Sequence, residues 1–537
     1  MRGLMQEWSL TVDRIIDHAA RWDGKREVVT RALSGEIVRT DYAAMRERAR
    51  RLSAALAARG IGRGDRVATM GWNSFRHVEA WFAIMGMGAV CHTLNPRLFR
   101  EQIVYIANHA EDHAIIVDPC FQDLLADMLP ALPRLGAIIV MGEASEVARD
   151  RLPGAVDYES VIAENHPEAA WGGFDEETAC ALCYTSGTTG NPKGVLYTHR
   201  SNVIHTLMTL QPDVFGLSIA DVVMPIVPMY HANGWGLPLS APAVGCKLVL
   251  PGSRLDGASL HDLCEREDVT FAAAVPTVWQ ALLQHLDDTG GRLTTLRRVL
   301  VGGAACPESI IRRLRDHGVE SKQGWGMTET SPIGSHSKLL PEIAALPFDD
   351  QVPWRLKQGR PPFGVDLKIV DDTGNRQPHD GAALGRLHVK GPTVASAYLG
   401  GTPGDILDRE GFFDTGDIAD IDAEGYMRIA DRAKDVIKSG GEWISSIEIE
   451  NIALGHPKVA LCAVIAIPDP KWDERPLLVV QLRDGETATA SEMLGTLEGR
   501  IAKWWMPEGV VFVPEMPLGA TGKIDKKRLR ERFPAAF

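Results

Sequence analysis

One short stretch, "YTSGTTGNPKG" from Tyr184 to Gly194, combines glycines, hydroxyl side chains and a single lysine. Glycines let backbone N–H groups approach phosphate oxygens closely, hydroxyl groups add donors, and a lysine adds a point charge. The composition therefore predicts a loop that holds a polyphosphate, with an exposed turn of small residues as the competing interpretation. The residues expected to bind are Thr185, Ser186, Gly187, Thr188, Thr189, Gly190 and Lys193.

The spacing of this loop differs from that of a Walker A loop, in which the lysine directly follows a glycine and a helix begins at once. Here Lys193 follows Pro192, which has no backbone N–H, and the run "GVLYTH" after it is typical of a strand. The apolar run "ACALCY" before the loop is also typical of a strand. This strand–loop–strand context argues against P-loop kinases and GTPases and against Rossmann enzymes, whose loops open a helix.

Two further groups could act on phosphate. Thr328 and Glu329 in "GMTET" place a hydroxyl beside a carboxylate, which suits a Mg²⁺ ion bridging phosphate oxygens. The same spacing fits a helix N-cap with an acidic first turn. Lys523 lies in a glycine-containing loop near the C-terminus, and Lys526 and Lys527 after it are expected to be surface charges of a helix.

The cysteines offer a weaker signal. Cys180 and Cys183 form a C-x-x-C pattern that a redox or zinc site could use. No second C-x-x-C occurs, and the pair lies in the apolar run before the loop, so positions in a buried strand are the favoured interpretation. Eight cysteines in 537 residues do not indicate a disulfide framework.

The elements that must position these groups alternate along the chain. "DRVATMGWN", "AIIVDP" and "LGAIIVMG" are typical of buried strands, and "DYAAMRERARRLSAALAARG" is typical of a helix with Gly60 at its C-terminal end. Alternation predicts an α/β fold with mostly parallel sheets. A chain of 537 residues is too long for one core, so more than one domain is expected.

The character of the sequence changes after about Asp431. We predict a compact set comprising a helix at 445–454, strands at 459–467, 476–482 and 509–513, a helix at 491–505, and a basic helix at the end. The predicted fold is α/β, with a large N-terminal domain of helix-flanked sheets and a small mobile α+β C-terminal domain. The boundaries are 1–431 and 432–537, with a hinge near Lys434.

The net charge of −13 argues against a general nucleic-acid or anionic-membrane surface. We find no secretory signal and no apolar run long enough to span a bilayer, so a cytoplasmic location is the default expectation.

Five motifs, in the expected order, resemble the adenylate-forming superfamily of acyl- and aryl-CoA synthetases, nonribosomal peptide adenylation domains and firefly luciferase. The resemblance covers nearly the whole chain and includes a small β-subdomain in the N-terminal domain. After the phosphate loop come an adenine and phosphate motif, a ribose motif, a hinge with a CoA-side loop, and a catalytic-lysine loop. These are "QGWGMTET" (323–330), "DTGDIA" (414–419), "DRAKDVIKSGGEWIS" (431–445) and "ATGKIDKK" (520–527).

The resemblance implies a two-step reaction that uses ATP, Mg²⁺ and coenzyme A. A carboxylate attacks the α-phosphate of ATP, which gives an acyl-adenylate and pyrophosphate, and the CoA thiolate then displaces AMP. The implied partners are a small carboxylic acid, ATP and CoA, with neither nucleic acid nor an integral membrane segment, and a homodimer stays open. A luciferase-like oxygenase and a ligase that loads a carrier protein are the alternatives.

The resemblance also implies roles for individual residues. Lys523 would stabilise the charge that develops during adenylation. Glu329 and Thr185 would coordinate Mg²⁺, and Thr328 would contact phosphate. Asp417 would accept the ribose hydroxyls, and Arg432 would contact ribose or phosphate. The other expected nucleotide contacts are Gly303, Ala304, Gly324, Trp325, Gly326 and Met327.

Trp325 occupies the position where the superfamily usually has tyrosine. Either ring can stack on adenine, although the indole replaces any hydrogen bond from a phenol. His231, Trp235, Gly302 and Trp325 are expected to line the acyl pocket. His231 would orient the substrate, and a hydrogen-bonded core histidine is an equal alternative.

Two tryptophans facing the pocket would shorten it, so a short- or medium-chain acid is expected. The whole pattern resembles the medium-chain branch, which includes ligases for 3-methylmercaptopropionate. For the second half-reaction, the small domain would rotate about its hinge and exchange the Lys523 loop for a CoA-side loop. The hinge and CoA-side residues are Lys434, Lys438, Gly440, Gly441, Glu442 and Trp443.

Overall fold

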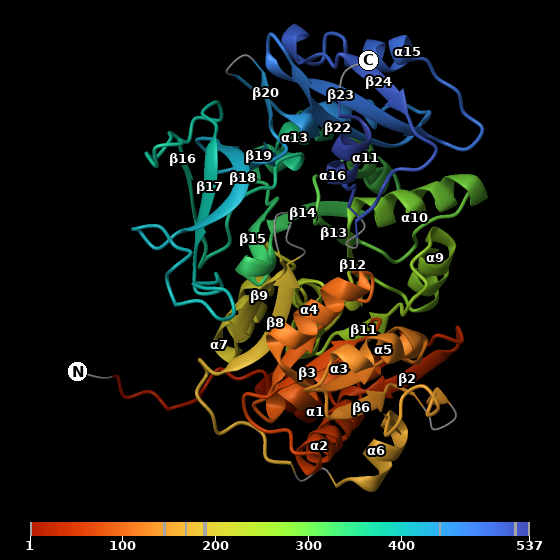
Figure 1. Ribbon diagram of the computed structural model, residues 1–537. Coiled ribbons are helices and arrows are strands. Elements are labelled where there is room, and N and C mark those ends of the chain that lie inside the picture. The colour runs from red at the N-terminus through yellow and green to blue at the C-terminus, as the bar shows by residue number, and fades with distance from the viewer. Residues whose placement is uncertain are drawn as a thin grey trace.

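The computed structural model of the protein describes residues 3–142, 146–166, 169–185, 191–439, 442–519 and 523–534. Strands in these ranges form four sheets, and helices cover the two largest (Figure 1). The predicted α/β class, with a large N-terminal part, a small β-subdomain and a small C-terminal part, is confirmed.

The first sheet is parallel at its centre, from β1 to β14, and antiparallel at both edges. Helices pack on each of its faces, and the apolar strand residues fall into two separate core clusters. Its order is β15 (Ile333–His336), β14 (Glu320–Gly326), β13 (Arg298–Gly302), β12 (Phe271–Ala274), β10 (Val222–Pro225), β11 (Lys247–Leu250), β1 (Glu27–Arg31) and β2 (Ile37–Asp41).

The second sheet is parallel except for its last pair, β8 and β9. These two strands are antiparallel and pair Thr185 with Lys193, so the predicted strand–loop–strand context is confirmed. Ser186 to Gly190 lie outside the described residues. The order is β7 (Val156–Asp157), β6 (Ala137–Val140), β5 (Asp112–Val117), β3 (Arg66–Met70), β4 (Val90–Thr93), β8 (Ala179–Thr185) and β9 (Lys193–Thr198).

Helices of the N-terminal part fill the space between the two large sheets and cover their outer faces. Helix α3 contacts β1 of the first sheet and β3, β4 and β8 of the second. Helix α2 ends as predicted, because Gly60 takes a φ of 82° and donates to the carbonyl of Ala57, while Ile61 donates to that of Leu56. The helices are α1 (Asp13–Trp22), α2 (Tyr42–Ala58), α3 (Phe75–Gly86), α4 (Arg100–Ala110), α5 (Gln122–Met128), α6 (Tyr158–Glu164), α7 (His199–Thr209), α8 (Leu237–Ala243), α9 (Gly257–Arg266), α10 (Pro276–Thr289), α11 (Glu308–Asp316), α12 (Pro341–Ala344) and α13 (Phe348–Arg355).

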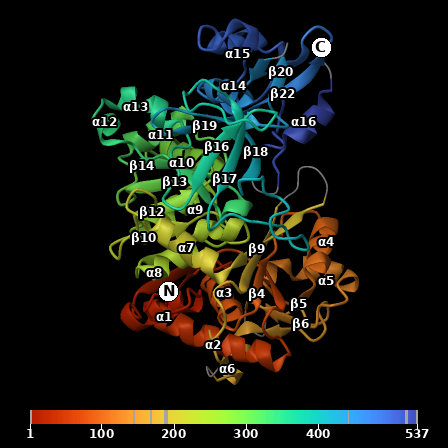
Figure 2. The same cartoon turned by 90° about the vertical axis from the view of Figure 1, so that its left-hand side faces the viewer.

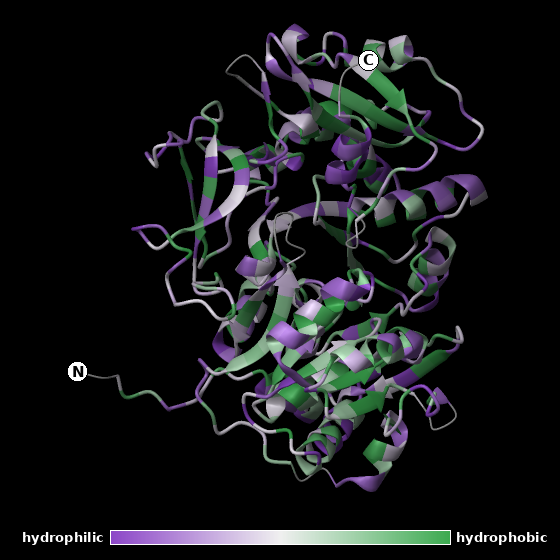
Figure 3. Cartoon of the chain, viewed as in Figure 1, coloured by the Kyte–Doolittle hydropathy of each residue, from purple (hydrophilic) through white to green (hydrophobic). Residues whose placement is uncertain are grey.

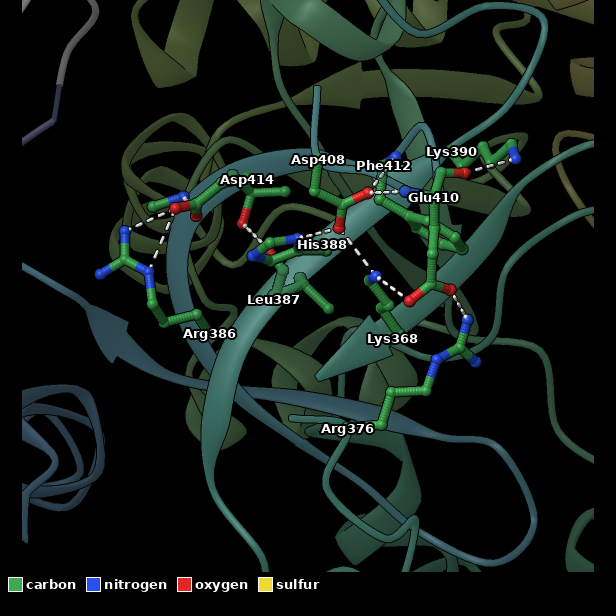
Figure 4. A network of polar contacts seen from close by, with 12 residues as sticks. Lys368, Arg376, Arg386, Leu387, His388, Lys390, Asp408, Glu410, Phe412 and Asp414 are labelled. Carbon is green, nitrogen blue, oxygen red and sulfur yellow. Dashed lines mark hydrogen bonds and ion pairs between the residues drawn. The ribbon is translucent and has the colours of Figure 1, made fainter. Parts of the chain in front are cut away.

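A small antiparallel sheet follows, which we call the β-subdomain. It is held on one face by a charged network around Lys368, whose side chain is only 5% exposed (Figure 4). The Lys368 ammonium lies 2.7 Å from Asp408 and 3.1 Å from Glu410, and it lies over the ring of Phe412. Its order is β16 (Asp366–Val370), β17 (Gly385–Lys390), β18 (Phe413–Ile421) and β19 (Met427–Arg432).

The last sheet forms the C-terminal unit and lies at the opposite end of the molecule from α1, α2 and α6 (Figures 1 and 2). Its long hairpin β22–β23 carries the apolar residues of a separate core, visible as the hydrophobic colouring in Figure 3. The strands are β20 (Ile437–Ser439), β21 (Glu442–Ile444), β22 (Val459–Asp469), β23 (Asp473–Leu482) and β24 (Gly509–Phe512), and the helices are α14 (Ser446–Ala453), α15 (Ala490–Leu497) and α16 (Lys526–Arg532).

Two expectations about this unit are wrong. The helix expected over 491–505 ends at Leu497, because Glu498 leaves the helical conformation with a ψ of 132° and Gly499 follows with a left-handed φ of 70°. Lys526 is not a surface charge: its ammonium lies 2.7 Å from the buried carboxylate of Glu450 and 2.5 Å from the hydroxyl of Ser446. A basic helix seen in sequence does not reveal that one of its cations faces a buried acid on α14.

The expectation for the cysteine pair is confirmed, since Cys180 and Cys183 are buried in β8. Across the described ranges, no group of three or more His, Cys, Asp or Glu side chains is arranged to hold a metal ion. In the same ranges, none of the helices has both the length and the apolar character needed to traverse a membrane.

Candidate active site

A buried carboxylate, Asp417 on β18, lies at the centre of the site. The indole N–H of Trp325, on the neighbouring sheet, donates to its Oδ2 at 2.9 Å, and Nε of Arg432 lies 2.8 Å from Oδ1. Burial raises the pKa of this carboxyl above its ordinary value, and Arg432, Trp325 and Lys523 oppose that effect. The Asp417 carboxylate is therefore a hydrogen-bond acceptor of fixed orientation, and its cationic neighbours favour its ionised form.

Lys523 comes from the C-terminal unit, and its charge acts on this carboxylate. A Cβ atom at Gly303, just after β13, would lie 3.6 Å from Cε of Lys523, so the lysine stem passes close to that glycine. Burial lowers the pKa of Lys523 to about 8, with Arg432 and Lys434 adding to the effect and Asp417 opposing it. The ammonium thus acts on a residue predicted to contact ribose, although Lys523 lies in a loop of the C-terminal unit and Asp417 lies on β18 of the β-subdomain.

Helix α10 holds the C-terminal unit in this position. The side-chain amide of Gln280 donates to the carbonyl of Ala460 at 2.8 Å. One turn later, Gln284 accepts from the guanidinium of Arg483 at 2.6 Å. These bonds hold the β22–β23 hairpin against α10.

Glu329 follows β14, and its side chain is a buried carboxylate suited to binding a cation. It is 5% exposed, and its Oε1 accepts a hydrogen bond from the hydroxyl of Tyr398 at 2.7 Å. Burial raises its pKa above the ordinary value, although Tyr398, Arg432 and Lys193 act in the opposite direction. Mg²⁺ prefers oxygen ligands, and the neighbouring groups only partly compensate the negative charge of Glu329, so this carboxylate is a suitable ligand.

The residues just before Glu329 pack closely against other segments of the backbone. A Cβ atom at Gly326 would lie 1.7 Å from the carbonyl oxygen of Pro332, so only glycine fits there. The carbonyl of Thr328 accepts a 2.7 Å hydrogen bond from Tyr197 on β9. Gly324 lies within β14, Met327 follows it, and the side chain of Ala304 is exposed beyond β13.

The phosphate loop is described only at its two ends. Thr185 closes β8, and Lys193 opens β9 with its ammonium 4.8 Å from the ring centroid of Tyr398. The expected roles of Ser186, Gly187, Thr188, Thr189 and Gly190 concern residues outside the described ranges.

The segment expected to line the acyl pocket has an unusual backbone. Residues 232 to 236 all have positive φ values, between 44° and 77°, although three of them are not glycine. We call this segment the left-handed turn. Such a run is strained and persists only where the surrounding structure enforces it. It directs the ring of Trp235 to Gly302, where an added Cβ would lie 2.9 Å from Cη2 of the indole.

His231 precedes the left-handed turn. Its side chain is half-buried, and this burial together with nearby Lys523 lowers its pKa to about 4. The imidazole is therefore neutral at physiological pH and can accept a hydrogen bond, but it cannot supply a positive charge.

Three residues outside the predicted site position this region. Asn73, buried after β3, donates to the carbonyls of Pro225 and Val227 at 2.7 and 2.9 Å and accepts from the backbone of Met229 at 2.8 Å. Cys183 lies 3.2 Å from the side-chain oxygen of Asn233 in the left-handed turn. The third is Tyr398. Asn73 and Tyr398 belong to no motif whose mechanism can be recognised from residue spacing, and the C-x-x-C pattern of Cys183 does not predict this contact.

The expected hinge and CoA-side residues lie in the C-terminal unit. Lys434 is exposed between β19 and β20. Lys438 and Trp443 pair across the β20–β21 hairpin, and the backbone N–H of Lys438 donates to Glu474 on β23. Gly440 and Gly441 lie outside the described residues, and Glu442 is described only through its backbone pairing.

Comparison with known families gives two matches. A family model described as "AMP-binding enzyme" matches residues 16–399, and one described as "AMP-binding enzyme C-terminal domain" matches residues 448–523.

Three curated relatives are each 47% identical to this chain. They are 3-methylmercaptopropionyl-CoA ligase of Ruegeria lacuscaerulensis, which aligns over 100% of both chains, medium-chain-fatty-acid–CoA ligase of Ectopseudomonas oleovorans, over 99% of this chain and 98% of the relative, and long-chain-fatty-acid–CoA ligase of Thermus thermophilus, over 98% and 96%.

Among solved structures, the anthranilate CoA ligase AuaEII in complex with anthranoyl-AMP superposes with a TM-score of 0.87 at 24% identity. The match covers 99% of each chain and supports the fold alone.

Proposed function

The chain belongs to the AMP-binding enzyme family, and from that membership we propose that it is an ATP-dependent acid–CoA ligase for a short- or medium-chain carboxylic acid. The observation that carries the proposal is the position of Lys523, whose stem passes next to Gly303 and whose charge acts on the Asp417 carboxylate that Arg432 contacts. A cation from the C-terminal unit and a ribose-type acceptor from the β-subdomain influence each other there, which suits chemistry at the phosphate next to a ribose.

In the first half-reaction, one oxygen of the acid attacks the α-phosphorus of ATP, and the bond to the β-phosphate oxygen breaks. Pyrophosphate leaves, and an acyl-adenylate remains. We assign Asp417 and Arg432 to the ribose, and Lys523 to the negative charge that gathers on the carboxylate and α-phosphate oxygens. The neutral His231 would orient the acid without competing with Lys523 for its charge.

Glu329 and Thr185 are the residues we propose to hold Mg²⁺, which would neutralise phosphate charge when bound. The buried carboxylate of Glu329 supports this assignment, because its pKa is raised by burial and a cation would stabilise its ionised form. Lys193 and the loop that follows Thr185 would bind the departing β- and γ-phosphates.

In the second half-reaction, the CoA thiolate attacks the acyl carbon and AMP leaves with the electrons of the acyl–oxygen bond. We propose that residues 432–537 rotate about Lys434 between the two steps, which requires the α10 bonds of Gln280 and Gln284 to break. A Lys434→Pro variant should then make adenylate at the wild-type rate but form thioester slowly. Equal rates for both steps in the variant would rule out this hinge.

Our proposal for the chain length of the acid is based on the pocket, because sequence identity to the relatives does not distinguish between acids. Relatives named for a short sulfur-containing acid, a medium-chain acid and a long-chain acid are equally similar to the chain. The ring of Trp235 against Gly302 favours a short pocket and makes 3-methylmercaptopropionate a candidate. CoA is favoured over oxygen or a carrier protein as acceptor because all three relatives are named as CoA ligases.

A screen of pyrophosphate release over carboxylic acids of two to sixteen carbons, with and without CoA, tests the proposal. We expect ATP-dependent release with short and medium acids, and AMP and acyl-CoA in equal amounts when CoA is present. No release with any acid would overturn it, and preference for a sixteen-carbon acid would overturn the pocket argument. A cytoplasmic location and a homodimer stay predictions, to be tested by cell fractionation and light scattering.

A further inference from the structure

A segment of the β-subdomain is fastened to the phosphate side of the site. In Figure 1 the loop after β17 descends toward β9, and the backbone N–H of Leu399 donates to the carbonyl of Gly194 at 2.8 Å. The N–H of Ala395 donates to the carbonyl of Glu329, also at 2.8 Å. The hydroxyl of Ser331 donates to the carbonyl of Thr393 at the same distance. Three bonds thus place this loop on both the lysine strand and the carboxylate segment.

Tyr398 extends from that loop to the two charged groups themselves. Its hydroxyl donates to Oε1 of Glu329 at 2.7 Å, and the ammonium of Lys193 lies 4.8 Å from its ring centroid. One side chain therefore contacts an anion with its edge and a cation with its face, which matches the charge distribution of a phenol ring.

We propose that Tyr398 is a positioning residue that fixes the carboxylate of Glu329 for Mg²⁺ and the ammonium of Lys193 for the departing phosphates. The inference rests on the proposed function. The bond engages Oε1 of Glu329 and so fixes the orientation of its carboxylate. Partners in the second layer around a metal site orient the ligands in this way, and their loss typically weakens metal affinity about tenfold or more.

Both charged groups need such restraint. Glutamate and lysine side chains have several rotatable bonds, and ordering them on substrate binding costs free energy. Holding both on one rigid ring orders them before ATP arrives. Because Tyr398 contacts both groups, it also sets the distance between the Glu329 carboxylate and the Lys193 ammonium. A residue that only filled space in the same position would not do this.

The test uses the full-length protein, with ATP, Mg²⁺ and a non-hydrolysable acyl-sulfamoyl adenosine as probes. Tyr398→Phe removes the hydroxyl and keeps the ring, whereas Tyr398→Leu removes both. Tyr158→Phe is the matched control, because Tyr158 also donates to a buried glutamate, Glu79 at 2.9 Å, far from this site. Calorimetry gives the affinity for each probe without turnover.

We expect Tyr398→Phe to raise the Mg²⁺ concentration for half-maximal ATP binding roughly tenfold. Its affinity for the acyl-sulfamoyl adenosine, which lacks β- and γ-phosphates, should equal that of wild type. Tyr398→Leu should weaken ATP binding roughly threefold more than the phenylalanine variant, because the ammonium loses the ring face. Tyr158→Phe should lower thermal stability but leave all three probes unaffected.

An unchanged Mg²⁺ requirement in Tyr398→Phe would overturn the inference, as would an equal shift in Tyr158→Phe, which would indicate general loosening. Loss of acyl-sulfamoyl adenosine binding in Tyr398→Phe would also contradict it, because the effect would then not be confined to the phosphate side. If wild type bound neither ATP nor the adenylate analogue, the proposed function itself would fail, and that outcome is distinct from the others.

Discussion

The indole N–H of Trp325 and the carboxylate of Asp417 are 2.9 Å apart, and this bond joins β14 of a large sheet to β18 of the β-subdomain. The indole thus orients the carboxylate that we assign to the ribose. The second carboxylate oxygen is occupied by Arg432, so both partners fix the plane of Asp417 before any nucleotide binds.

Trp325→Phe should keep an aromatic ring and lose the N–H donor. We expect ATP to bind about tenfold more weakly, since hydrogen bonds to charged groups are worth roughly 1.5–3 kcal/mol. The measurement is calorimetric affinity for ATP and for 2′,3′-dideoxy-ATP. If Trp325 acts through Asp417, the variant should bind the dideoxy nucleotide nearly as well as wild type does. An equal loss for both nucleotides would assign Trp325 to adenine stacking instead.

Lys523→Ala should abolish pyrophosphate release while a supplied acyl-adenylate is still converted to acyl-CoA at a rate close to that of wild type. The reason is that Lys523 neutralises charge formed only in adenylation. Single-turnover measurement of each half-reaction checks this. Lys527→Ala, which removes an exposed lysine four positions away, is the control and should leave both rates unchanged. Equal damage to both half-reactions in Lys523→Ala would contradict the assignment.

The pH dependence of adenylation should reflect the same lysine. Its pKa in the free enzyme is lowered to about 8, mainly by burial, so the ammonium is lost as pH rises through that value. We therefore expect kcat/KM for ATP in adenylation to be constant below about pH 7 and to fall above about pH 8. Lys523→Arg keeps its charge and should flatten this limb, even if its rate is lower. A wild-type profile that stays level to pH 10 would contradict the prediction.

Trp235→Ala should lengthen the acyl pocket. The indole rests against Gly302, so its removal opens space in line with the end of β13. We expect the preferred acid to gain several carbons, with kcat/KM for a ten- to twelve-carbon acid rising about tenfold relative to the shortest substrate. A pyrophosphate-release series over chain length measures it. Trp279→Phe, a fully buried indole outside the site, serves as control for general loosening.

Lys368→Met should destabilise the β-subdomain. Removing this cation leaves Asp408 with less compensation, at a cost of roughly 2–3 kcal/mol in the free energy of unfolding. Arg376→Met removes an exposed partner of Glu410 and should cost less than about 1 kcal/mol. Thermal unfolding of both variants measures the difference, and equal midpoints would show that the buried pair has no special value.

The sign of the pH effect on this pair follows from Asp408. Burial raises the pKa of its carboxyl, but Lys368 and two backbone N–H groups outweigh burial and hold the pKa below its ordinary range. Stabilisation by the pair is therefore complete above the usual aspartate value near pH 4 and is lost as pH falls through the lowered pKa. The gap between wild type and Lys368→Met should close in that acid range and stay constant at neutral pH.

Sequence alone predicted the elements that follow from local pattern. The strands around the phosphate loop and the end of α2 at Gly60 depend on neighbours in the chain, and both are confirmed. It did not predict the bond between Trp325 and Asp417, because 92 positions separate them and an aromatic ring in that motif suggests stacking.

Long-range partners explain the other differences. Lys526 is a basic residue on a basic helix, and only the packing of α16 near α14 reveals that its partner is the buried Glu450. Tyr398 and Asn73 belong to no recognisable motif, because their contacts are with residues that are distant in the sequence and close only in the fold. The roles assigned to Lys523, Glu329 and the other site residues stay predictions that the experiments above test.

The left-handed turn constrains how this enzyme could acquire a new substrate. Each non-glycine residue in that conformation costs roughly 1–2 kcal/mol relative to its usual backbone. Two residues outside this segment stabilise it: Cys183 contacts Asn233 within the turn, and Asn73 binds the backbone of Met229 just before it. Mutations within the turn therefore trade against foldability, and a side chain added at Gly302, on the opposite wall, would meet the Trp235 ring and the carbonyl oxygen of Gly324. Adaptation toward other acids is therefore expected to need paired changes, and a laboratory library should vary Trp235 and Gly302 together.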